Sequence, residues 1–414
     1  MYMVEKLVPN IRFRGFDDEW KDTSLSDIAT FSKGKGISKN DIYDEGIECV
    51  RYGELYTKYG EIIYDIYSKT NLDKTELVLS DNNDILIPCS GETAIDLATA
   101  SCIQKDQVAI GGDITIIKTN QYAPFITYYL NQKKNEIARF AQGVSIVHLY
   151  PKDFKSLKLK IPSINEQKKI IFLLEEVTKK ETLLEKKYHH YQDFKKYLIQ
   201  QIFTQKLRFE NQTDEWISVK IEDIFEKITD YVAAGSFADI KKNVSYLKEP
   251  DYAQLIRTAD LKSCFNNNDF VYIDKHAFDY LWRVNLNQPC IILPNIGNIG
   301  EVYYVDPKNL PYDNNALAPN AILLKSEENI KFKYYLLESK YFKNQLDIIN
   351  ESGGRGKFNK TNLKKIKIKI PKDKVEKEKI SECLSNVDNK LNLYKTQLEN
   401  VQSFKVGLLQ QMFI

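Results

Sequence analysis

The feature that most constrains this 414-residue chain is a long helical pattern that occurs twice. Between Asn165 and Phe203, apolar side chains recur at alternating steps of four and three residues, which is the heptad period of a coiled coil. The stretch from Glu376 to Phe413 repeats this pattern in the same register, 210 residues further on. We therefore predict two long helices that pair through Ile170, Leu174, Val177, Leu184, Tyr188, Tyr191 and Leu198 of the first and Ile380, Leu384, Val387, Leu391, Tyr394, Leu398, Val401 and Leu408 of the second.

The two copies of the helix also share an interruption. Lys195 occupies a position of the apolar seam, and Lys405 occupies the same position in the second copy. A shared period with a shared exception indicates a duplication. The simpler interpretation of both lysines is a solvated side chain. The alternative is a point where the helix pair opens or where a partner helix docks.

The duplication extends beyond the helices and is circular. Residues 11–13 resemble 207–209, and residues 18–20 resemble 214–216, in each case 196 residues apart. The segment 207–209 follows the first helix, whereas its counterpart stands near the N-terminus and not after the second helix. If the helices run antiparallel, a pseudo-two-fold axis brings the N-terminal segment beside the end of the second helix. The helices then form a rod of roughly 58 Å, at about 1.5 Å per residue, with one globular half at each end.

Each half outside the helices is typical of a mixed α/β domain. Short β-branched runs bounded by Gly, Asn or Asp predict strands, and aromatic–aliphatic faces predict shorter helices. The predicted strands are 84–88, 113–118, 157–161, 290–294, 301–305, 321–325 and 366–370, and the predicted shorter helices are 124–141 and 331–349.

The expected fold class is α/β. Two α/β domains in a pseudo-two-fold arrangement are separated by two long antiparallel helices that form a coiled coil. The predicted segments are a first domain at 1–163, a central helix at 164–205, a second domain at 206–372 and a C-terminal helix at 373–414.

Composition and motifs argue against several protein classes. No apolar run approaches the roughly 20 residues of a membrane span, and the N-terminus lacks the apolar core of a signal peptide. We therefore expect a cytoplasmic protein without a membrane partner. The cysteines form no CxxC pair and the histidines lack metal-ligand spacing, so we expect no metal site. The glycine-rich segments 295–300 and 353–358 do not fit dinucleotide or phosphate-loop patterns, and no catalytic residue is predicted.

Positive charge concentrates where each long helix begins. Residues 355–379 hold eleven Lys or Arg and three acidic residues, and residues 152–169 hold six Lys and two acidic residues. Such lysines suit a polyanion and supply salt-dependent affinity that does not depend on base sequence. Bases are read by Arg, Asn, Gln, Ser or Thr, and loops are where we expect them. The candidate DNA-binding residues, each of which is otherwise an ordinary loop or capping residue, are Lys33, Lys35, Arg51, Tyr52, Ser90, Glu92, Thr93, Gln142, Ser145, Arg257, Trp282, Arg283, Asn295, Asn298, Arg355 and Lys357.

The chain as a whole resembles the specificity subunit of Type I restriction-modification systems. The resemblance rests on two divergent α/β halves separated by two near-identical long helices, arranged as a circular duplication. Its shorter motifs are Asp-Glu-Trp at 18–20 and 214–216, Arg-x-Gly/Ala-acid-Leu at 51–55 and 257–261, and the Ile-Pro that precedes each helix. The second half departs from the first at Asn211 and Gln212, which replace Gly15 and Phe16.

This resemblance implies a division of labour. The subunit is not catalytic, and each half reads one part of a bipartite, asymmetric target in double-stranded DNA. The helix pair spaces the halves and docks two methyltransferase subunits, which flip and methylate adenines. ATP-dependent restriction subunits can join and cleave remote DNA. No cofactor is expected on this chain, because S-adenosylmethionine, ATP and Mg²⁺ belong to the partner subunits.

Two alternatives of other classes remain open at this point. One is a coiled-coil structural adaptor with two protein-binding domains and no role on DNA, against which the basic strands and divergent loops argue. The other is an enzyme that itself methylates or cuts DNA.

Overall fold

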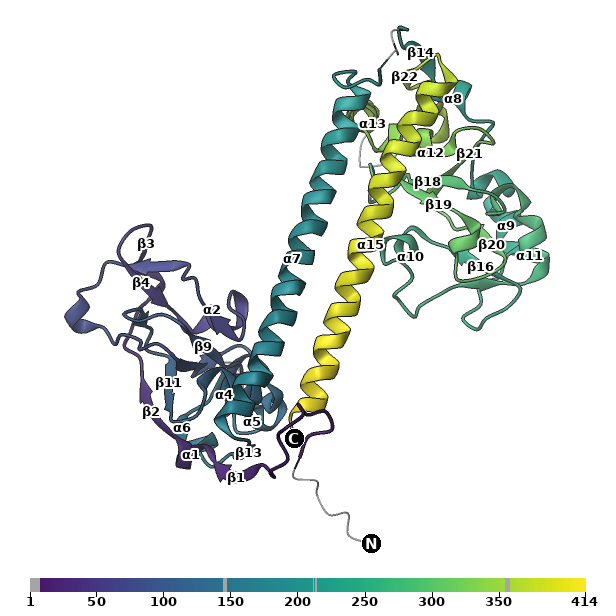
Figure 1. Ribbon diagram of the computed structural model, residues 1–414. Helices are drawn as coiled ribbons and strands as arrows, with labels where there is room; N and C mark the ends of the chain where they lie inside the picture. Colours follow the sequence, from purple (N-terminus) through teal and green to yellow (C-terminus); the bar gives the residue numbers. More distant parts are fainter. Residues whose placement is uncertain (1–7, 144–146, 211, 213, 354–357) are drawn as a thin grey trace. The chain divides into compact units, whose positions relative to one another are not determined.

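The chain folds into two compact units that share both long helices (Figure 1). The computed structural model describes residues 8–143, 147–210, 212, 214–353 and 358–414. Unit 1 comprises Met1–Glu185 with Thr396–Ile414, and unit 2 comprises Lys186–Lys395. The division falls within the helices, so each unit contains one stretch of each helix.

The two long helices are α7 (Ile164–Phe203, 40 residues) and α15 (Lys374–Met412, 39 residues). Both agree with the predicted stretches to within two residues. In unit 1, the beginning of α7 and the end of α15 contribute to one core cluster, with Ile170 and Leu174 from α7 and Leu408 from α15. In unit 2 the opposite ends meet, with Leu198 from α7 and Leu384 from α15. The helices therefore run antiparallel within each unit, as predicted.

Burial along the predicted seam is not uniform. The seam residues nearest the helix ends are buried, and burying each such aliphatic side chain stabilises the fold by roughly 1.5–3 kcal/mol. Toward the middle of the helices the seam is half-buried. There the rings of Tyr191 and Tyr394 meet edge to face with centroids 5.1 Å apart. The half-buried seam residues are Tyr188, Tyr191, Leu391, Tyr394, Leu398 and Val401.

The charged seam positions form ion pairs across the helix pair. Lys195 Nζ lies 2.7 Å from Asp388 Oδ1, and Lys405 Nζ lies 3.2 Å from Glu181 Oε2. Lys195 also lies over the aromatic rings of Tyr334 and Tyr335. The interpretation of these lysines as solvated side chains was therefore wrong, because each is partly buried and neutralised by a carboxylate on the facing helix.

Unit 1 is built on a five-stranded sheet in the order β2-β11-β7-β9-β5, in which only β5 pairs in parallel. A second sheet has the order β10-β4-β6-β3, and the pairs β1–β13 and β12–β8 complete the unit. The strands are β1 (Lys21–Ser24), β2 (Ala29–Lys33), β3 (Ile42–Tyr43), β4 (Ile47–Val50), β5 (Ile62–Ile63), β6 (Ser68–Thr70), β7 (Asp84–Pro88), β8 (Ser90–Gly91), β9 (Ser101–Ile103), β10 (Ala109–Ile110), β11 (Ile114–Thr119), β12 (Val147–His148) and β13 (Lys158–Ile161). Its shorter helices are α1 (Leu25–Ile28), α2 (Tyr52–Thr57), α3 (Ala94–Leu97), α4 (Ala123–Gln132), α5 (Lys134–Ala138) and α6 (Pro151–Phe154).

Unit 2 repeats this plan with fewer strands. Its main sheet has the order β15-β21-β18-β19, its second sheet the order β17-β16-β20, and β14 pairs with β22. The strands are β14 (Ile217–Lys220), β15 (Lys227–Asp230), β16 (Ala253–Ile256), β17 (Tyr272–Ile273), β18 (Cys290–Pro294), β19 (Tyr303–Val305), β20 (Asn315–Leu317), β21 (Ala321–Lys325) and β22 (Lys367–Ile370). The shorter helices are α8 (Ile221–Ile224), α9 (Phe237–Asn243), α10 (Thr258–Lys262), α11 (Lys275–Tyr280), α12 (Ile330–Glu338), α13 (Lys340–Gly353) and α14 (Lys360–Lys365), with short 3-10 turns η3 (Tyr231–Ala234) and η4 (Trp282–Val284).

The repeat seen in the sequence is a repeat of topology. The antiparallel trio β2-β11-β7 corresponds to β15-β21-β18, and the parallel pair β10–β4 corresponds to β20–β16. The pair β1–β13 corresponds to β14–β22. The predicted α/β class with two long helices is therefore confirmed.

Three predicted elements need correction. The predicted strand 301–305 is shorter, because β19 begins at Tyr303. The predicted helix 124–141 is two helices, since the backbone of Lys133 leaves the helical conformation (φ −91°, ψ 13°) between α4 and α5. The predicted helix 331–349 is also two, because Ser339 is extended. Its hydroxyl donates to the Leu336 carbonyl that ends α12 and accepts from an amide in the first turn of α13.

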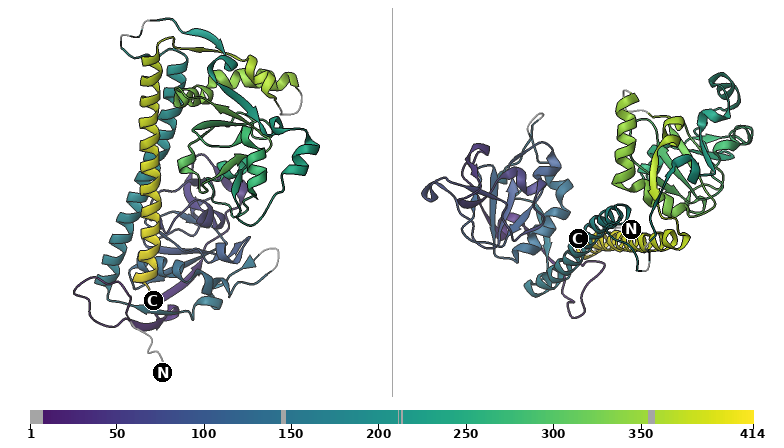
Figure 2. Two further views of the ribbon diagram at one scale, coloured as in Figure 1. Left: turned by 90° about the vertical axis from the view of Figure 1, so that its right-hand side faces the viewer. Right: turned by 90° about the horizontal axis from the view of Figure 1, so that it is seen from above.

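A backbone amide of the N-terminal segment bonds a carbonyl in the last turn of α15. The connection that follows α7 makes the same bond to the last turn of α7. The Ile11 amide donates to the Gln411 carbonyl (3.0 Å), and the Leu207 amide donates to the equivalent Gln201 carbonyl (3.1 Å). Figure 2 shows the N-terminal segment beside the C-terminal end of α15. The circular repeat is therefore present in the contacts of the structure as well as in the sequence.

A buried ion pair holds each of these segments. Arg12 makes a bidentate pair with Glu166 (2.7 and 2.9 Å), and Arg208 makes the same pair with Glu376 (3.1 and 3.0 Å). Bidentate Arg–carboxylate pairs are the strongest of the charge-assisted hydrogen bonds. The tryptophans of the two Asp-Glu-Trp motifs, Trp20 and Trp216, are both buried, and the Trp216 indole lies beside the second of these pairs.

Candidate nucleic-acid interface

Each unit has one groove that lies at an equivalent place in the repeat. Groove 1, in unit 1, has a volume of about 990 Å³ and is lined by residues 33–39, 51–54, 56–58, 92 and 111–113. Groove 2, in unit 2, has a volume of about 760 Å³ and is lined by residues 230–232, 237, 240–241, 244, 246, 295–296, 319–321 and 358–359. Three segments are common to both grooves: the one that follows β2 or β15, the one that follows β7 or β18, and the turn before β11 or β21.

Matching backbone hydrogen bonds establish this equivalence. The Cys89 amide, just after β7, donates to the Asp113 carbonyl just before β11 (2.7 Å). The Asn295 amide, just after β18, donates in the same way to the Asn320 carbonyl before β21 (3.1 Å). Asn295 therefore occupies in unit 2 the place that Cys89 occupies in unit 1.

Glycines allow the two walls of groove 1 to approach each other backbone to backbone. A Cβ added to Gly34 would lie 2.1 Å from the Gly111 carbonyl oxygen, and one added to Gly112 would lie 2.9 Å from the Gly36 amide nitrogen. No other residue type fits these positions without moving the backbone. The neighbouring Lys33 is held only by a long, exposed pairing with Asp113 (3.7 Å), so its ammonium group remains available to an anion.

Arg51 lines groove 1 and is the N-cap residue of α2. Its amide donates to Glu54 Oε2 (3.0 Å), and its guanidinium lies 3.6 Å from the same carboxylate. Burial opposes ionisation of the Glu54 carboxyl. Hydrogen bonds from Ser68, the Arg51 amide and Lys58 outweigh that effect and lower its pKa. Glu54 therefore stays charged and orients Arg51, whose Nε donates to no other described residue.

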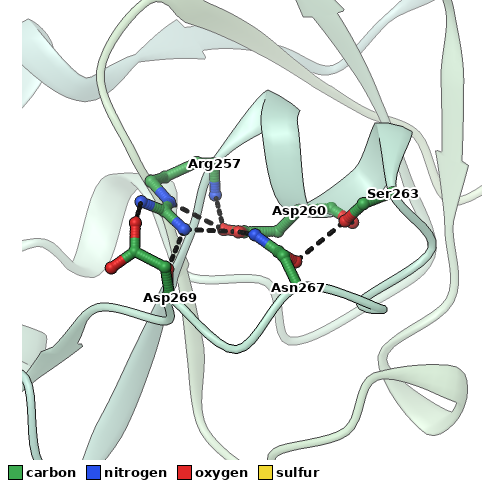
Figure 3. A network of polar contacts seen from close by, with 5 residues as sticks. All are labelled: Arg257, Asp260, Ser263, Asn267 and Asp269. Atoms are coloured by element: carbon green, nitrogen blue, oxygen red, sulfur yellow. Dashed lines mark hydrogen bonds and ion pairs between the residues drawn. The ribbon is translucent and has the colours of Figure 1, made fainter. Parts of the chain in front are cut away.

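The equivalent residue of unit 2, Arg257, is committed to an internal network (Figure 3). Its Nη2 and Nε lie 2.7 and 3.1 Å from the two oxygens of buried Asp260, and its Nη1 lies 3.2 Å from Asp269. Asn267 donates to Asp260 as well (3.1 Å) and accepts from Ser263 (2.8 Å). Burial raises the pKa of Asp260, but the bonds from Arg257 and Asn267 prevail and lower it.

The Arg-x-Gly/Ala-acid-Leu motif is thus a helix-capping arrangement in both units. Arg257 does not line groove 2, and a contact with a base would require its two ion pairs to break. The same motif therefore presents a cation to a groove in unit 1 only.

Groove 2 has an apolar rim. Phe237 is 82% exposed and Tyr246 is 56% exposed, and the exposed side chains of Val232 and Ile296 also line it. Asp230, at its edge, is neutralised by Lys360 (2.9 Å). Among the residues predicted to bind DNA in unit 2, Asn295 lines this groove.

Trp282 and Arg283 form a separate surface on η4. The Arg283 guanidinium lies 4.3 Å from the centroid of the Trp282 ring, and Lys227 Nζ lies 5.1 Å from it. The exposed indole is thus flanked by two cations, an arrangement that can stack on a base or contact a phosphate.

The remaining predicted residues are dispersed. Ser90 Oγ lies 3.1 Å from a ring nitrogen of His148, and the Thr93 hydroxyl caps α3. Gln142 is exposed and forms a β-bridge with His148, and Asn298 is exposed on a loop. Groove 1 brings together Lys33, Lys35, Arg51, Tyr52 and Glu92. The residues predicted to bind DNA that lie outside the described part of the chain are Ser145, Arg355 and Lys357.

Sequence reasoning missed the lining of groove 2. Phe237 and Tyr246 follow β15 as the lysines of 33–39 follow β2, so the repeat itself could have located them. An exposed aromatic side chain in a loop has no periodic signal, so nothing local in the sequence distinguishes these two residues.

Within the described residues, no group of His, Cys, Asp and Glu is arranged to hold a metal ion. The same part of the chain contains no helix with the length and apolarity needed to cross a bilayer.

Comparisons with known proteins converge on one family. The family described as the Type I restriction modification DNA specificity domain matches residues 17–190 and 213–403. The Type I restriction enzyme MjaVIII specificity subunit of Methanocaldococcus jannaschii is 23% identical, over 95% of this chain and 91% of its own length.

Two solved structures share the fold. The S subunit of a Type I restriction-modification system from M. genitalium superposes with a TM-score of 0.62 at 17% identity, covering 98% of this chain and 99% of its own. A chain from a structural study of complex assembly and conformational transition in the type I R-M system superposes with a TM-score of 0.55 at 11% identity, covering 97% and 99%.

Proposed function

The chain belongs to the Type I restriction-modification DNA specificity family, and on that premise we propose how it divides the recognition of DNA between its units. It is a non-catalytic specificity subunit with two recognition domains. Unit 1 recognises one half of a bipartite target in double-stranded DNA through groove 1, and unit 2 recognises the other half through groove 2. The observation that carries this proposal is the pair of equivalent grooves with different linings.

Groove 1 suits DNA because its cations are exposed and because glycines in its walls leave backbone groups uncovered by side chains. Lys33, Lys35 and Lys39 supply phosphate contacts, which give affinity without sequence preference. Arg51 and Tyr52 supply groups that can reach base edges, and arginine pairs with the major-groove edge of guanine. The groove thus combines positioning by phosphates with reading of bases.

Each unit exposes one leucine and one phenylalanine on the helix pair, at positions that are equivalent in the repeat, and we call each such set the apolar patch of its unit. Leu183 and Phe404 are 52% and 55% exposed in unit 1, and Phe194 and Leu393 are both 47% exposed in unit 2. The members of each type are 210 residues apart in the sequence. In unit 1 the Glu181–Lys405 ion pair aligns the two helices where Leu183 and Phe404 stand.

Because the two patches consist of equivalent residues, we expect each to bind one copy of the same partner. We assign them to two methyltransferase subunits, which the family resemblance implies, and ATP-dependent restriction subunits join that assembly. S-adenosylmethionine then acts on the methyltransferase subunits, and ATP and Mg²⁺ act on the restriction subunits. The chain itself binds none of these cofactors.

An electrophoretic mobility shift with the chain and its methyltransferase partner tests the DNA assignment. Binding should weaken steeply with salt and should select a bipartite sequence, because lysine–phosphate contacts release counterions. Mapping methylated adenines in host DNA then identifies both half-sites. Salt-insensitive binding, or none, would favour the structural adaptor.

A second assay separates the specificity subunit from an enzyme. The chain alone, incubated with labelled S-adenosylmethionine and DNA, should transfer no methyl group. The same DNA should be methylated once the methyltransferase subunit is added. Turnover by the chain alone would refute the non-catalytic assignment.

A further inference from the structure

The backbone beneath grooves 1 and 2 makes equivalent hydrogen bonds, although the two grooves differ in volume and lining. The Leu149 amide donates to the Cys89 carbonyl (3.0 Å), and the Phe358 amide donates to the Asn295 carbonyl (3.2 Å). Together with the amide bonds of Cys89 and Asn295 to the turns before β11 and β21, these contacts place each groove floor on the same scaffold. Any difference in what the grooves bind therefore comes from side chains.

The residue that follows the equivalent strands β7 and β18 differs in chemistry between the units, and only in unit 2 does it line the groove. In unit 1 the Cys89 thiol is buried and lies 3.1 Å from the Thr115 hydroxyl, so it has a partner. In unit 2 the Asn295 side chain lines the groove, and its Oδ1 accepts no hydrogen bond from a described residue. An unsatisfied buried acceptor is costly, so the site is primed for a donor from a bound molecule.

The rim differs as well. Groove 1 is lined by several cations, which stand beside two tyrosines. Groove 2 presents the exposed faces of Phe237 and Tyr246 beside the exposed Lys241. Exposed apolar side chains make no favourable contact with phosphates, so this rim indicates a contact with an apolar group of the DNA. In the major groove the apolar group is the C5-methyl of thymine, and asparagine pairs with the N6 and N7 atoms of adenine.

We propose that groove 2 reads at least one A·T base pair beyond that of the methylated adenine. Asn295 contacts the adenine edge, and Phe237 and Tyr246 contact the thymine methyl. Groove 1, with cations in these places, is insensitive to the methyl group. This inference rests on the proposed function and adds the base chemistry of one half-site.

Uracil substitution tests the methyl contact directly. Each thymine of the mapped target is replaced by uracil, one at a time, and affinity is measured for the full chain in complex with its methyltransferase subunits. Removing a buried methyl group should weaken binding about fourfold at one or more positions of a single half-site. Positions in the other half-site should change less than twofold.

Variants assign the affected thymine to groove 2. Phe237→Ala with Tyr246→Ala should abolish the difference between thymine and uracil, because the partner of the methyl group is gone. Phe237 is largely exposed, so the fold should be retained, and circular dichroism checks it. The matched control is Lys35→Ala in groove 1, which should weaken binding to both duplexes equally.

The outcomes separate this inference from the function on which it rests. If the complex binds no bipartite DNA target, the proposed function fails. If it binds one, the inference is overturned when uracil is neutral in both half-sites, or when its effect survives loss of both aromatic side chains.

Discussion

Groove 1 and groove 2 stand on equivalent strands with matching backbone hydrogen bonds, yet their linings differ. Groove 1 is rich in lysines and glycines, whereas groove 2 exposes apolar and aromatic side chains beside Lys241 and Asn295. The frame is set by buried strands, where a change of side chain disturbs the core. Exposed loop side chains bear less of this constraint, except where close backbone approach requires a glycine, as at Gly34 and Gly112, so their chemistry can diverge at lower cost to stability. A duplicated chain can in this way carry two unlike recognition surfaces.

The two units also differ in how their ends are held. The segment at Leu207 is tied to α7 by the chain itself, whereas its counterpart at Ile11 is held to α15 by a backbone hydrogen bond and to the start of α7 by the Arg12–Glu166 pair. The Trp216 indole donates to Glu376 (3.3 Å), but the buried indole of Trp20 donates to no described residue. The non-covalent end therefore has less hydrogen bonding and depends more on its ion pair.

The largest expected effect concerns the two apolar patches of the helix pair. Phe194→Asp in unit 2 or Phe404→Asp in unit 1 should reduce the number of bound methyltransferase subunits from two to one, and the double variant to none. Truncating a central aromatic anchor alone costs about 2–4 kcal/mol of binding, and a charge adds to that. Native mass spectrometry counts the subunits.

The matched control for the patches is Phe172→Glu. Phe172 is exposed on α7, and the second helix already carries Glu382 at the corresponding position. This variant should keep two methyltransferase subunits. Loss of both subunits from either single variant would mean that the patches do not act independently.

The next largest effect should come from the ion pairs that hold the ends. Glu166→Ala and Glu376→Ala should each destabilise the chain by about 3–5 kcal/mol, because each leaves a partly buried arginine unpaired. Only Glu166→Ala should release the N-terminal segment to protease before global unfolding, since that segment has no covalent link to α15. Urea unfolding and limited trypsin digestion measure the two effects.

Conservative replacements serve as controls for that comparison. Glu166→Gln and Glu376→Gln keep a hydrogen-bond acceptor and should cost less than the alanine variants. An identical digestion pattern for Glu166→Ala and Glu376→Ala would contradict the distinction between the two ends.

A smaller difference is expected between the two charged seam pairs. Asp388→Ala should cost about 2 kcal/mol, because Asp388 accepts from the Tyr335 hydroxyl (2.6 Å) as well as pairing with Lys195. Glu181→Ala should cost about 1 kcal/mol, because the Glu181 carboxylate pairs with Lys405 and accepts no tyrosine hydroxyl from the described residues. Chemical denaturation of each variant gives these values, and equal costs would argue against the role of Tyr335.

The smallest expected effect is on the salt dependence of DNA binding. Lys35→Ala in groove 1 should lower the slope of log K against log salt by about 0.9, the value of one phosphate contact on duplex DNA. Lys179→Ala, on the exposed face of α7, should leave the slope unchanged. Fluorescence anisotropy at four or five salt concentrations resolves this difference, and an unchanged slope for Lys35→Ala would remove that lysine from the interface.

Sequence patterns predicted the elements whose signal is local. The heptad period placed both helices within two residues of their observed ends, and β7, β18 and β21 have the predicted bounds. The helix breaks at Lys133 and Ser339 escaped prediction because apolar residues seven apart flank each break, Leu130 and Ile137 at the first and Tyr335 and Phe342 at the second. A helix break that keeps the apolar residues on the buried face does not change their spacing in the sequence, so the spacing cannot reveal it.

The candidate site was predicted less completely, and Arg51 and Arg257 show why. The two residues share one motif and one capping geometry, but only Arg51 lines a groove. The difference depends on Asp269, which lies twelve residues along the chain from Arg257 and engages its guanidinium. No property of the motif itself reveals such a partner.

Sequence alone determined that this chain is a circular duplication with two long helices in one register, because period and repeat are properties of neighbouring residues. Tertiary structure alone decided that Lys195 and Lys405 are paired rather than solvated, and that the loops after β2 and β15 become the walls of grooves. Those outcomes depend on which distant segments the sheets and helices bring together, and the free energy of that assembly comes from long-range burial that no local pattern records.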